Sequence, residues 1–230
     1  MTKKLLLVPL LGLILFLFII SLEDLYGFYD DAGRAFFSEN VFAETGSRNF
    51  VTAIYLDYRL FDSLFEAGIL LIAVSGVMWI SKHTIKEKNA NFMLDKYKTP
   101  ELFITFSRLL YPIMLAFGLY VIINGHLSPG GGFQGGAIVA TAILILYYID
   151  ITKTIDVRVI LTIEKILFIL LVSLSLLSII TRDGRPFTNF IASENVEAKA
   201  IFLMLLNVII GAKVSLGLVA IFTAFLKEGR

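Results

Sequence analysis

Six long apolar runs, separated by polar segments, dominate the pattern of hydrophobic and polar positions along the chain. A helix rises about 1.5 Å per residue and needs about 20 residues to cross a hydrocarbon core of about 30 Å. The pattern therefore predicts an all-α integral membrane protein with about six transmembrane helices. The predicted helices are Leu5–Leu22, Leu60–Ile80, Leu102–Ile123, Phe133–Ile149, Val159–Thr181 and Lys199–Leu226.

The first predicted helix follows Lys3 and Lys4, and a basic start before an apolar run also occurs in secretory signal peptides. Its apolar part is longer than a usual signal core, and no small-x-small cleavage site follows it. We therefore expect a retained helix. The next segment, Glu23–Arg59, is too polar to cross a membrane and too aromatic for a plain disordered linker. We expect it to lie as a lid on the membrane surface or on a neighbouring subunit.

The stretch that joins the third and fourth predicted helices and begins the fourth has the sequence NGHLSPGGGFQGG, Asn124–Gly136. Residues 125–132 are too few for anything but a tight hairpin. The proline lacks an N–H and suits the start of a helix, while the glycines permit backbone angles closed to other residues. Gly132, Gly136 and Ala140 recur at four-residue spacing, which predicts a face for close helix packing. The predicted structural motif comprises Pro129, Gly130, Gly131, Gly132, Phe133, Gly135 and Gly136.

His126 lies within this turn, and three roles are open for it. Imidazole titrates near neutral pH, which suits proton transfer. However, Asn124, Ser128 and the glycine backbone offer local hydrogen-bond partners, so a role in fixing the turn needs fewer assumptions. We expect this structural role, with proton transfer and an inter-subunit contact as the alternatives.

Two carboxylates lie at the start of the second predicted helix. Asp62 and Glu66 are four residues apart and share one helix face. Glu66 lies one turn, about 6 Å, deeper in the apolar run. A carboxylate at that depth usually faces a partner or a water-filled path. The alternative is an acid hydrated at the membrane edge and paired with Arg59.

Further polar side chains interrupt the other apolar runs. Arg108 lies near the start of its helix and either snorkels to the interface or pairs with a carboxylate of another subunit. Glu164 and Lys165 are adjacent, so they lie on different faces and need separate partners or the membrane interface. Lys213, on the same run as Asn207, is far from both ends and should face protein, a carboxylate or water. The predicted ion-pathway or subunit-contact residues are Asp62, Glu66, Arg108, His126, Asn207 and Lys213.

The turn sequence GHLSPGGGFQGG resembles the signature G-H-x-x-P-G-G-G-F-x-G-G of the B-type subunits of Mrp-type multisubunit cation/proton antiporters. It equally resembles the corresponding subunit of membrane-bound hydrogenases and of related sulfur-reducing complexes that contain an Mrp-like module. The resemblance covers about residues 99–230. It implies a four-helix membrane subunit, other membrane subunits as partners, and sodium ions and protons as the transported species.

A second resemblance concerns the start of the second helix. The pattern D-x-R-x-F-D-x-x-x-E occurs in the C-terminal part of the large A-type Mrp subunits, or in the small separate subunit that replaces it in the hydrogenases. It is matched here by Asp57, Arg59, Phe61, Asp62 and Glu66. The two resemblances together imply a fusion. Residues 1–85 would form a two-helix A-like region, 86–98 a basic cytoplasmic linker, and 99–230 a four-helix B-like domain.

Composition narrows the chemistry that the chain can carry. Apolar residues make up 57% and charged residues 17%, which is typical of a polytopic membrane protein rather than a soluble domain. The chain has no cysteine, and its two histidines have no metal-ligand spacing, so we expect no metal or cofactor. No basic cluster is interleaved with aromatic residues, so we expect a lipid bilayer and protein partners but no nucleic acid.

The distribution of Lys and Arg predicts the orientation. The polar segments on the side of both termini carry 11 of these residues and the alternate segments carry 5. Because segments rich in Lys and Arg stay inside, both termini are expected in the cytoplasm and the glycine turn at the outer side. With the resemblance, this predicts a multi-pass protein of the cytoplasmic (inner) membrane of a prokaryote.

Two classes of function fit these observations. The resemblance implies a non-catalytic subunit that helps to assemble an Mrp-type cation/proton-translocating module and to line its ion pathway. That module is either a stand-alone antiporter or the ion-pumping arm of a respiratory membrane-bound oxidoreductase. The alternative is an independent small transporter or a structural membrane protein unrelated to Mrp. The sequence has neither a nucleophile–base constellation for an enzyme nor two similar halves for an independent transporter.

Overall fold

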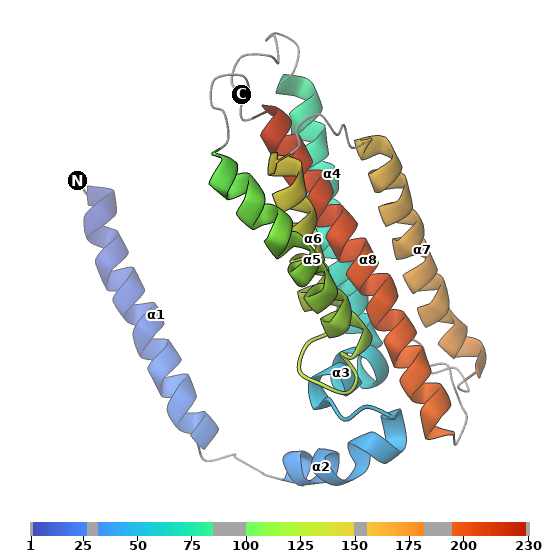
Figure 1. Ribbon diagram of the computed structural model, residues 1–230. Helices are drawn as coiled ribbons and strands as arrows, with labels where there is room; N and C mark the ends of the chain where they lie inside the picture. Colours follow the sequence, from blue (N-terminus) through green and yellow to red (C-terminus); the bar gives the residue numbers. More distant parts are fainter. Residues whose placement is uncertain (1, 27–31, 85–99, 150–155, 182–194, 229–230) are drawn as a thin grey trace. The chain divides into compact units, whose positions relative to one another are not determined.

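The computed structural model describes residues 2–26, 32–84, 100–149, 156–181 and 195–228, and every element in these ranges is a helix (Figure 1). A short π-helix, η1, joins two of them. In chain order the elements are α1 (Thr2–Tyr26), α2 (Ala32–Thr45), α3 (Phe50–Ala53), η1 (Ile54–Tyr58), α4 (Leu60–Thr84), α5 (Glu101–Ile123), α6 (Gly132–Ile149), α7 (Val157–Thr181) and α8 (Val196–Glu228).

The prediction of an all-α membrane protein is confirmed. All six predicted helices are present, as α1 and α4 to α8. Four of them contain stretches long and apolar enough to cross a membrane, namely Leu60–Ser81, Glu101–Ile123, Val157–Leu177 and Val196–Phe225. The apolar stretches within α1 and α6 are shorter, Pro9–Ser21 and Gly132–Tyr147. The predicted linker 86–98 lies outside the described residues.

The chain forms two compact units, Met1–Asn40 and Val41–Arg230. In the first unit, every side chain of α1 from Pro9 to Ser21 is exposed. The second unit is a helical bundle around α8, which contacts α4, α5, α6, α7 and η1 (Figure 1). In addition, α5 packs on α6 and α4 packs on α7.

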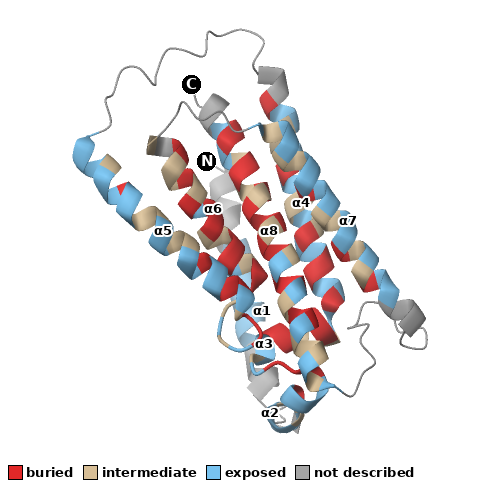
Figure 2. Cartoon of the chain, turned by 45° about the vertical axis from the view of Figure 1, so that its right-hand side comes forward, coloured by how far each residue is buried: buried red, intermediate tan, exposed pale blue. Residues whose placement is uncertain are grey.

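Burial follows this arrangement, because buried residues concentrate on α8 and on the sides of α4 and α6 that face it (Figure 2). The main apolar core comprises Leu56, Leu60, Leu64, Ala67, Leu171, Phe202, Leu203, Leu206, Ile210 and Val214. The outer surface is apolar too. Ile72 of α4 is 73% exposed and Leu102 of α5 is 82% exposed. Such large apolar side chains suit a surface that meets lipid or other membrane subunits rather than water.

The sequence pattern did not predict the short helices before α4. The side chain of Asn49 accepts a hydrogen bond from the N–H of Val51 and so caps the start of α3. The chain continues through η1, and Arg59 then breaks the helix before α4 begins at Leu60. The hydroxyl of Ser63 donates to the carbonyl of Tyr55, 2.5 Å away, and ties the first turn of α4 back to η1.

Candidate functional site

The glycine turn between α5 and α6 is held by the polar segment that precedes α4. The carbonyl oxygen of His126 accepts three hydrogen bonds from this segment. The donors are the N–H of Arg48 at 2.9 Å, the N–H of Asn49 at 3.1 Å and the hydroxyl of Ser47 at 2.8 Å. A carbonyl with three donors is fully occupied, so the middle of the turn is fixed in place.

Two side chains of the same segment bind further carbonyls of the turn. The amide of Asn49 donates to the carbonyls of Gly125 at 2.8 Å and Ser128 at 2.9 Å. The hydroxyl of Thr52 donates to Gly125 at 2.6 Å. We expected the whole segment 23–59 to lie on the membrane surface or on another subunit. Residues 47–55 of this segment contact the turn of the same chain, because carbonyls of the turn that no helix satisfies take their donors from them.

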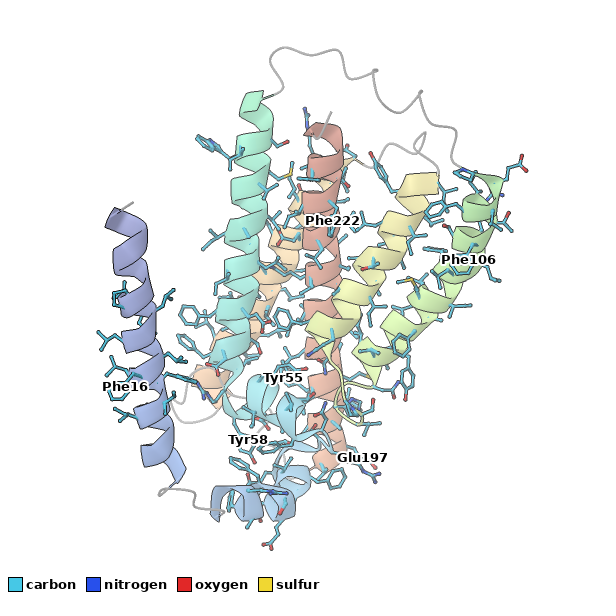
Figure 3. The ribbon with its side chains drawn as sticks, turned by 90° about the vertical axis from the view of Figure 1, so that its left-hand side faces the viewer. Phe16, Tyr55, Tyr58, Phe106, Glu197 and Phe222 are labelled. Atoms are coloured by element: carbon cyan, nitrogen blue, oxygen red, sulfur yellow. The ribbon has the colours of Figure 1, made fainter. Side chains whose placement is uncertain are left out.

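Asn207 of α8 anchors the other side of the turn from inside the bundle. Its Oδ1 accepts a hydrogen bond from the N–H of Gly132, at 2.8 Å, and one from the hydroxyl of Tyr55, at 3.1 Å. Burial raises the pKa of Tyr55, so its hydroxyl remains a donor near neutral pH. Tyr55 lies at the end of the bundle where α4 begins (Figure 3). One amide of α8 therefore joins the start of α6 to η1.

The glycines of the turn and of α6 allow this close approach. Gly130 and Gly131 have φ of +138° and +152°, which other residues rarely adopt. A Cβ on Gly132 would lie 2.6 Å from the carbonyl oxygen of Asn207, and one on Gly136 would lie 2.7 Å from that of Gly211. Gly135 faces α5, and a Cβ on Gly135 would lie 2.8 Å from the carbonyl oxygen of Gly118 on that helix. Thus α6 uses small residues on both sides.

The remaining motif residues have less restricted surroundings. Pro129 is exposed at the tip of the turn. Phe133 is partly buried and packs against the main apolar core.

The ring of His126 is buried, with only 8% of the residue exposed, and its Nδ1 has no hydrogen-bond partner within the described residues. Burial lowers the pKa of His126, and the main chain of Ile123 opposes this shift. The imidazole is therefore neutral near pH 7. The hydrogen bonds that hold the turn at this residue run through its backbone carbonyl. The expected role of the ring, with Asn124, Ser128 and the glycine backbone as partners, stays a prediction.

A buried ion pair crosses the bundle further along α8. The Nζ of Lys213 lies 3.1 Å from Oε1 of Glu164 on α7, and both side chains are fully buried. Nζ also donates to the carbonyl oxygen of Ala67 on α4, 2.5 Å away, and lies 5.8 Å from the centre of the Phe168 ring. The pair therefore joins α4, α7 and α8 through a single ammonium group.

The other predicted pathway residues lie on the surface of the bundle. Asp62 pairs with Arg59 at 2.9 Å, and both side chains are largely exposed. Glu66 and Arg108 are also exposed. Arg59 forms its ion pair with Asp62, so the alternative in which Arg59 pairs with Glu66 is not observed.

The structure thus separates the six predicted pathway residues into two groups. Asn207 and Lys213 lie on one buried helix, and His126 belongs to the turn that Asn207 anchors. The three others face outward.

Glu164 was not among the predicted pathway residues, although it is the partner of Lys213. A signal was present in the sequence, since Glu164 and Lys165 were expected to need separate partners or the membrane interface. Lys165 is indeed exposed while Glu164 is buried. Asn49 and Thr52 were missed because nothing in a single sequence links them to a turn more than 70 residues away. Tyr55 was missed for the same reason, since its partner Asn207 is still more distant.

Comparison with known proteins gives a consistent set of similarities. The family model described as a domain related to the MnhB subunit of Na+/H+ antiporter matches residues 102–220, just over half of the chain. An uncharacterized protein of Methanocaldococcus jannaschii is 33% identical over 112 residues, which is 42% of this chain and 42% of that protein. The Na+/H+ antiporter B-type subunit of Alkalihalophilus pseudofirmus is 46% identical over 43 residues, 19% of this chain and 30% of that protein.

A putative antiporter subunit of Staphylococcus saprophyticus is 35% identical over 89 residues, 36% of this chain and 60% of that protein. The chain therefore spans less than two thirds of the length of each of these relatives.

Two solved structures resemble the fold. A chain of the membrane-bound sulfane sulfur reductase, an archaeal respiratory membrane complex, matches with a TM-score of 0.75 and 28% identity. The match covers 98% of this chain and 99% of that one. A chain of the Mrp complex from Dietzia matches with a TM-score of 0.59 and 23% identity, over 94% of this chain and 26% of that one. The second likeness concerns the fold alone.

Proposed function

Because the chain belongs to the family of domains related to the MnhB subunit of Na+/H+ antiporters, we propose that it is an accessory transmembrane subunit of a multisubunit complex that translocates cations and protons. Its role is to assemble the membrane arm and to line part of the ion pathway. Sodium ions and protons are the proposed cargo, and the cytoplasmic membrane of a prokaryote is the proposed location, with both termini inside.

Within this class, the redox-coupled version is the better supported. The observation that carries this choice is the match to the sulfane sulfur reductase chain, which runs over nearly the whole of both chains at 28% identity. The Dietzia chain is matched over only 26% of its length, so there the same fold is part of a much longer polypeptide. The likeness over nearly the whole of the sulfane sulfur reductase chain therefore favours a respiratory complex.

We further propose that the chain is a fusion of two family components, and the contact between the two regions supports this. The side chains of Ser47, Asn49, Thr52 and Tyr55 come from the A-like region, and they bind the turn and Asn207 of the B-like domain. On this proposal, the hydrogen bonds are a subunit interface enclosed within one chain.

Purification of the complex from native membranes through a tag on this chain tests the proposal. We expect several membrane subunits together with water-soluble redox subunits that contain iron and acid-labile sulfide. In membrane vesicles, reduction of a sulfur substrate should drive sodium or proton movement. A complex of membrane subunits that exchanges sodium for protons and contains no iron would assign the chain to a stand-alone antiporter. A functional homodimer would contradict both versions.

A further inference from the structure

The described surroundings of the Lys213 ammonium include three groups that attract cations. Nζ lies 3.1 Å from Glu164 Oε1, 2.5 Å from the carbonyl oxygen of Ala67 and 5.8 Å from the centre of the Phe168 ring. A carboxylate, a carbonyl and an aromatic face are attracted to any small cation and not to an ammonium alone. These three groups therefore form a cation site that the ammonium of Lys213 already occupies.

The Glu164 carboxylate is not satisfied by this one contact. Within the described part of the chain, Oε1 has the Lys213 ammonium as its close polar partner, at 3.1 Å, and Oε2 has no hydrogen-bond partner. An ionised carboxylate can accept about four hydrogen bonds, and buried polar atoms normally have partners. A fully buried carboxylate with a single counter-charge therefore retains a strong attraction for a second cation.

Gly217, one turn after Lys213 on α8, places no side chain against the carboxylate. A Cβ built on Gly217 would lie 3.6 Å from Glu164 Oε1 and 3.3 Å from the nearest methyl group of Val74. The glycine thus leaves Oε1 uncovered on the α8 side, where an alanine methyl group would contact it.

From these observations we propose that Glu164 is a cation-exchange site, at which a proton or a sodium ion takes the place of the Lys213 ammonium. A proton from a hydronium ion forms an O–H bond on the carboxylate and leaves a water molecule, while Lys213 stays protonated and its ammonium still donates to the Ala67 carbonyl. When sodium enters, it binds the carboxylate oxygens in the same way. In either case the site gains one positive charge, and repulsion from the nearby ammonium makes the binding reversible, as a conduction site requires.

The identity of the cation that crosses the membrane rests on the proposed function, but binding at Glu164 does not. The test therefore measures binding through stability, in the intact complex, without reference to redox activity. In Lys213→Met the ammonium is absent and the Glu164 charge is uncompensated. The apparent Tm of this variant is measured in NaCl and in choline chloride at equal ionic strength, and in choline chloride over a pH series.

If sodium is the ligand, we expect the Tm of Lys213→Met to rise by a constant step for each tenfold increase in sodium concentration. The reason is that a ligand of the folded state stabilises it in proportion to the logarithm of the ligand concentration. If the ligand is a proton, acid should raise the Tm in choline chloride to the same extent as in NaCl. The matched control is the double variant Glu164→Gln/Lys213→Met, which has no carboxylate at this site and should show neither dependence.

Three results would overturn the proposal. One is a Lys213→Met complex whose Tm responds to sodium and pH no more than that of the double variant. Another is normal ion transport by the double variant, because an uncharged pair cannot exchange cations. The third is failure of both variants to assemble, since a pair that cannot be replaced even by two neutral side chains is a fixed structural contact.

Discussion

Replacement of Gly136 by alanine should weaken the contact between α6 and α8, because the added methyl group has no room. A Cβ at this position would lie 2.7 Å from the carbonyl oxygen of Gly211 and 2.9 Å from Cβ of Val214. Both atoms are fixed to the α8 backbone, so no rotation of a side chain can move them away. The helices would have to separate until the first distance reaches the 3.4 Å at which ordinary contact begins.

The size of the effect follows from two opposing contributions. Overpacking of a close contact costs about 1–3 kcal/mol. Alanine in place of glycine within a helix stabilises the helix by about 1 kcal/mol. The net loss is therefore up to about 2 kcal/mol, and each kcal/mol lowers the Tm of a chain of this size by about 2–4 °C.

The chain offers a matched control in Gly76 of α4, where nothing lies within 4 Å of the position that a Cβ would take. Gly76→Ala gains helix propensity without a clash, so its Tm should equal or exceed that of the wild type. Both variants are compared by thermal unfolding in the same detergent, and by the yield of complex that co-purifies with each. If Gly136→Ala unfolds at the temperature of Gly76→Ala or above it, close packing at α6 does not limit stability and the reasoning is refuted.

Three further predictions follow from the site. Asn207→Ala removes the acceptor of the Gly132 N–H and of the Tyr55 hydroxyl, and should lower the free energy of unfolding by about 1–3 kcal/mol for each buried donor left unpaired. The control is Asn124→Ala, which alters only a local contact at the end of α5 and is measured by the same thermal unfolding. Since burial lowers the native pKa of His126 below the ordinary 6.5, the unfolded chain binds more protons between these two values, and stability should fall as pH drops through this window. The His126→Gln variant should lose that component in a pH series of thermal unfolding, while retaining most proton-coupled activity. Finally, Glu66→Gln should reduce ion-coupled transport more than the yield of assembled complex, and unchanged transport at normal yield would exclude a role in conduction.

The number and positions of the long helices were predictable, because an apolar run of about 20 residues has few other stable environments. The spacing of Gly132 and Gly136 likewise indicated a close-packed face. It did not indicate which helix would meet that face, since small residues permit close approach without selecting a partner. Gly135, one residue away, meets a different helix.

The buried ion pair shows more clearly which contacts a sequence alone does not predict. The depth of Lys213 in its run predicted a partner, and Glu164 was conspicuous at the start of another run. Their pairing depends on how far α7 is displaced along α8, and this displacement is set by packing of the whole bundle. The contacts of Ser47–Tyr55 with the turn were beyond prediction for a related reason. Polar residues outside the membrane carry no periodic signal, and many arrangements satisfy their hydrogen bonds.

The central position of α8 has a consequence for how the protein is made. This helix follows α4 to α7 in the sequence, so Glu164 is synthesised 49 residues before the lysine that neutralises it. At about 5–20 residues per second, translation leaves the acid without its counter-charge for about 2–10 seconds. The N–H of Gly132 lacks its acceptor for longer, because Asn207 follows it by 75 residues. We therefore expect nascent chains that stop before Val196 to remain bound to the insertion machinery or to be degraded, since only arrival of the last helix completes both contacts.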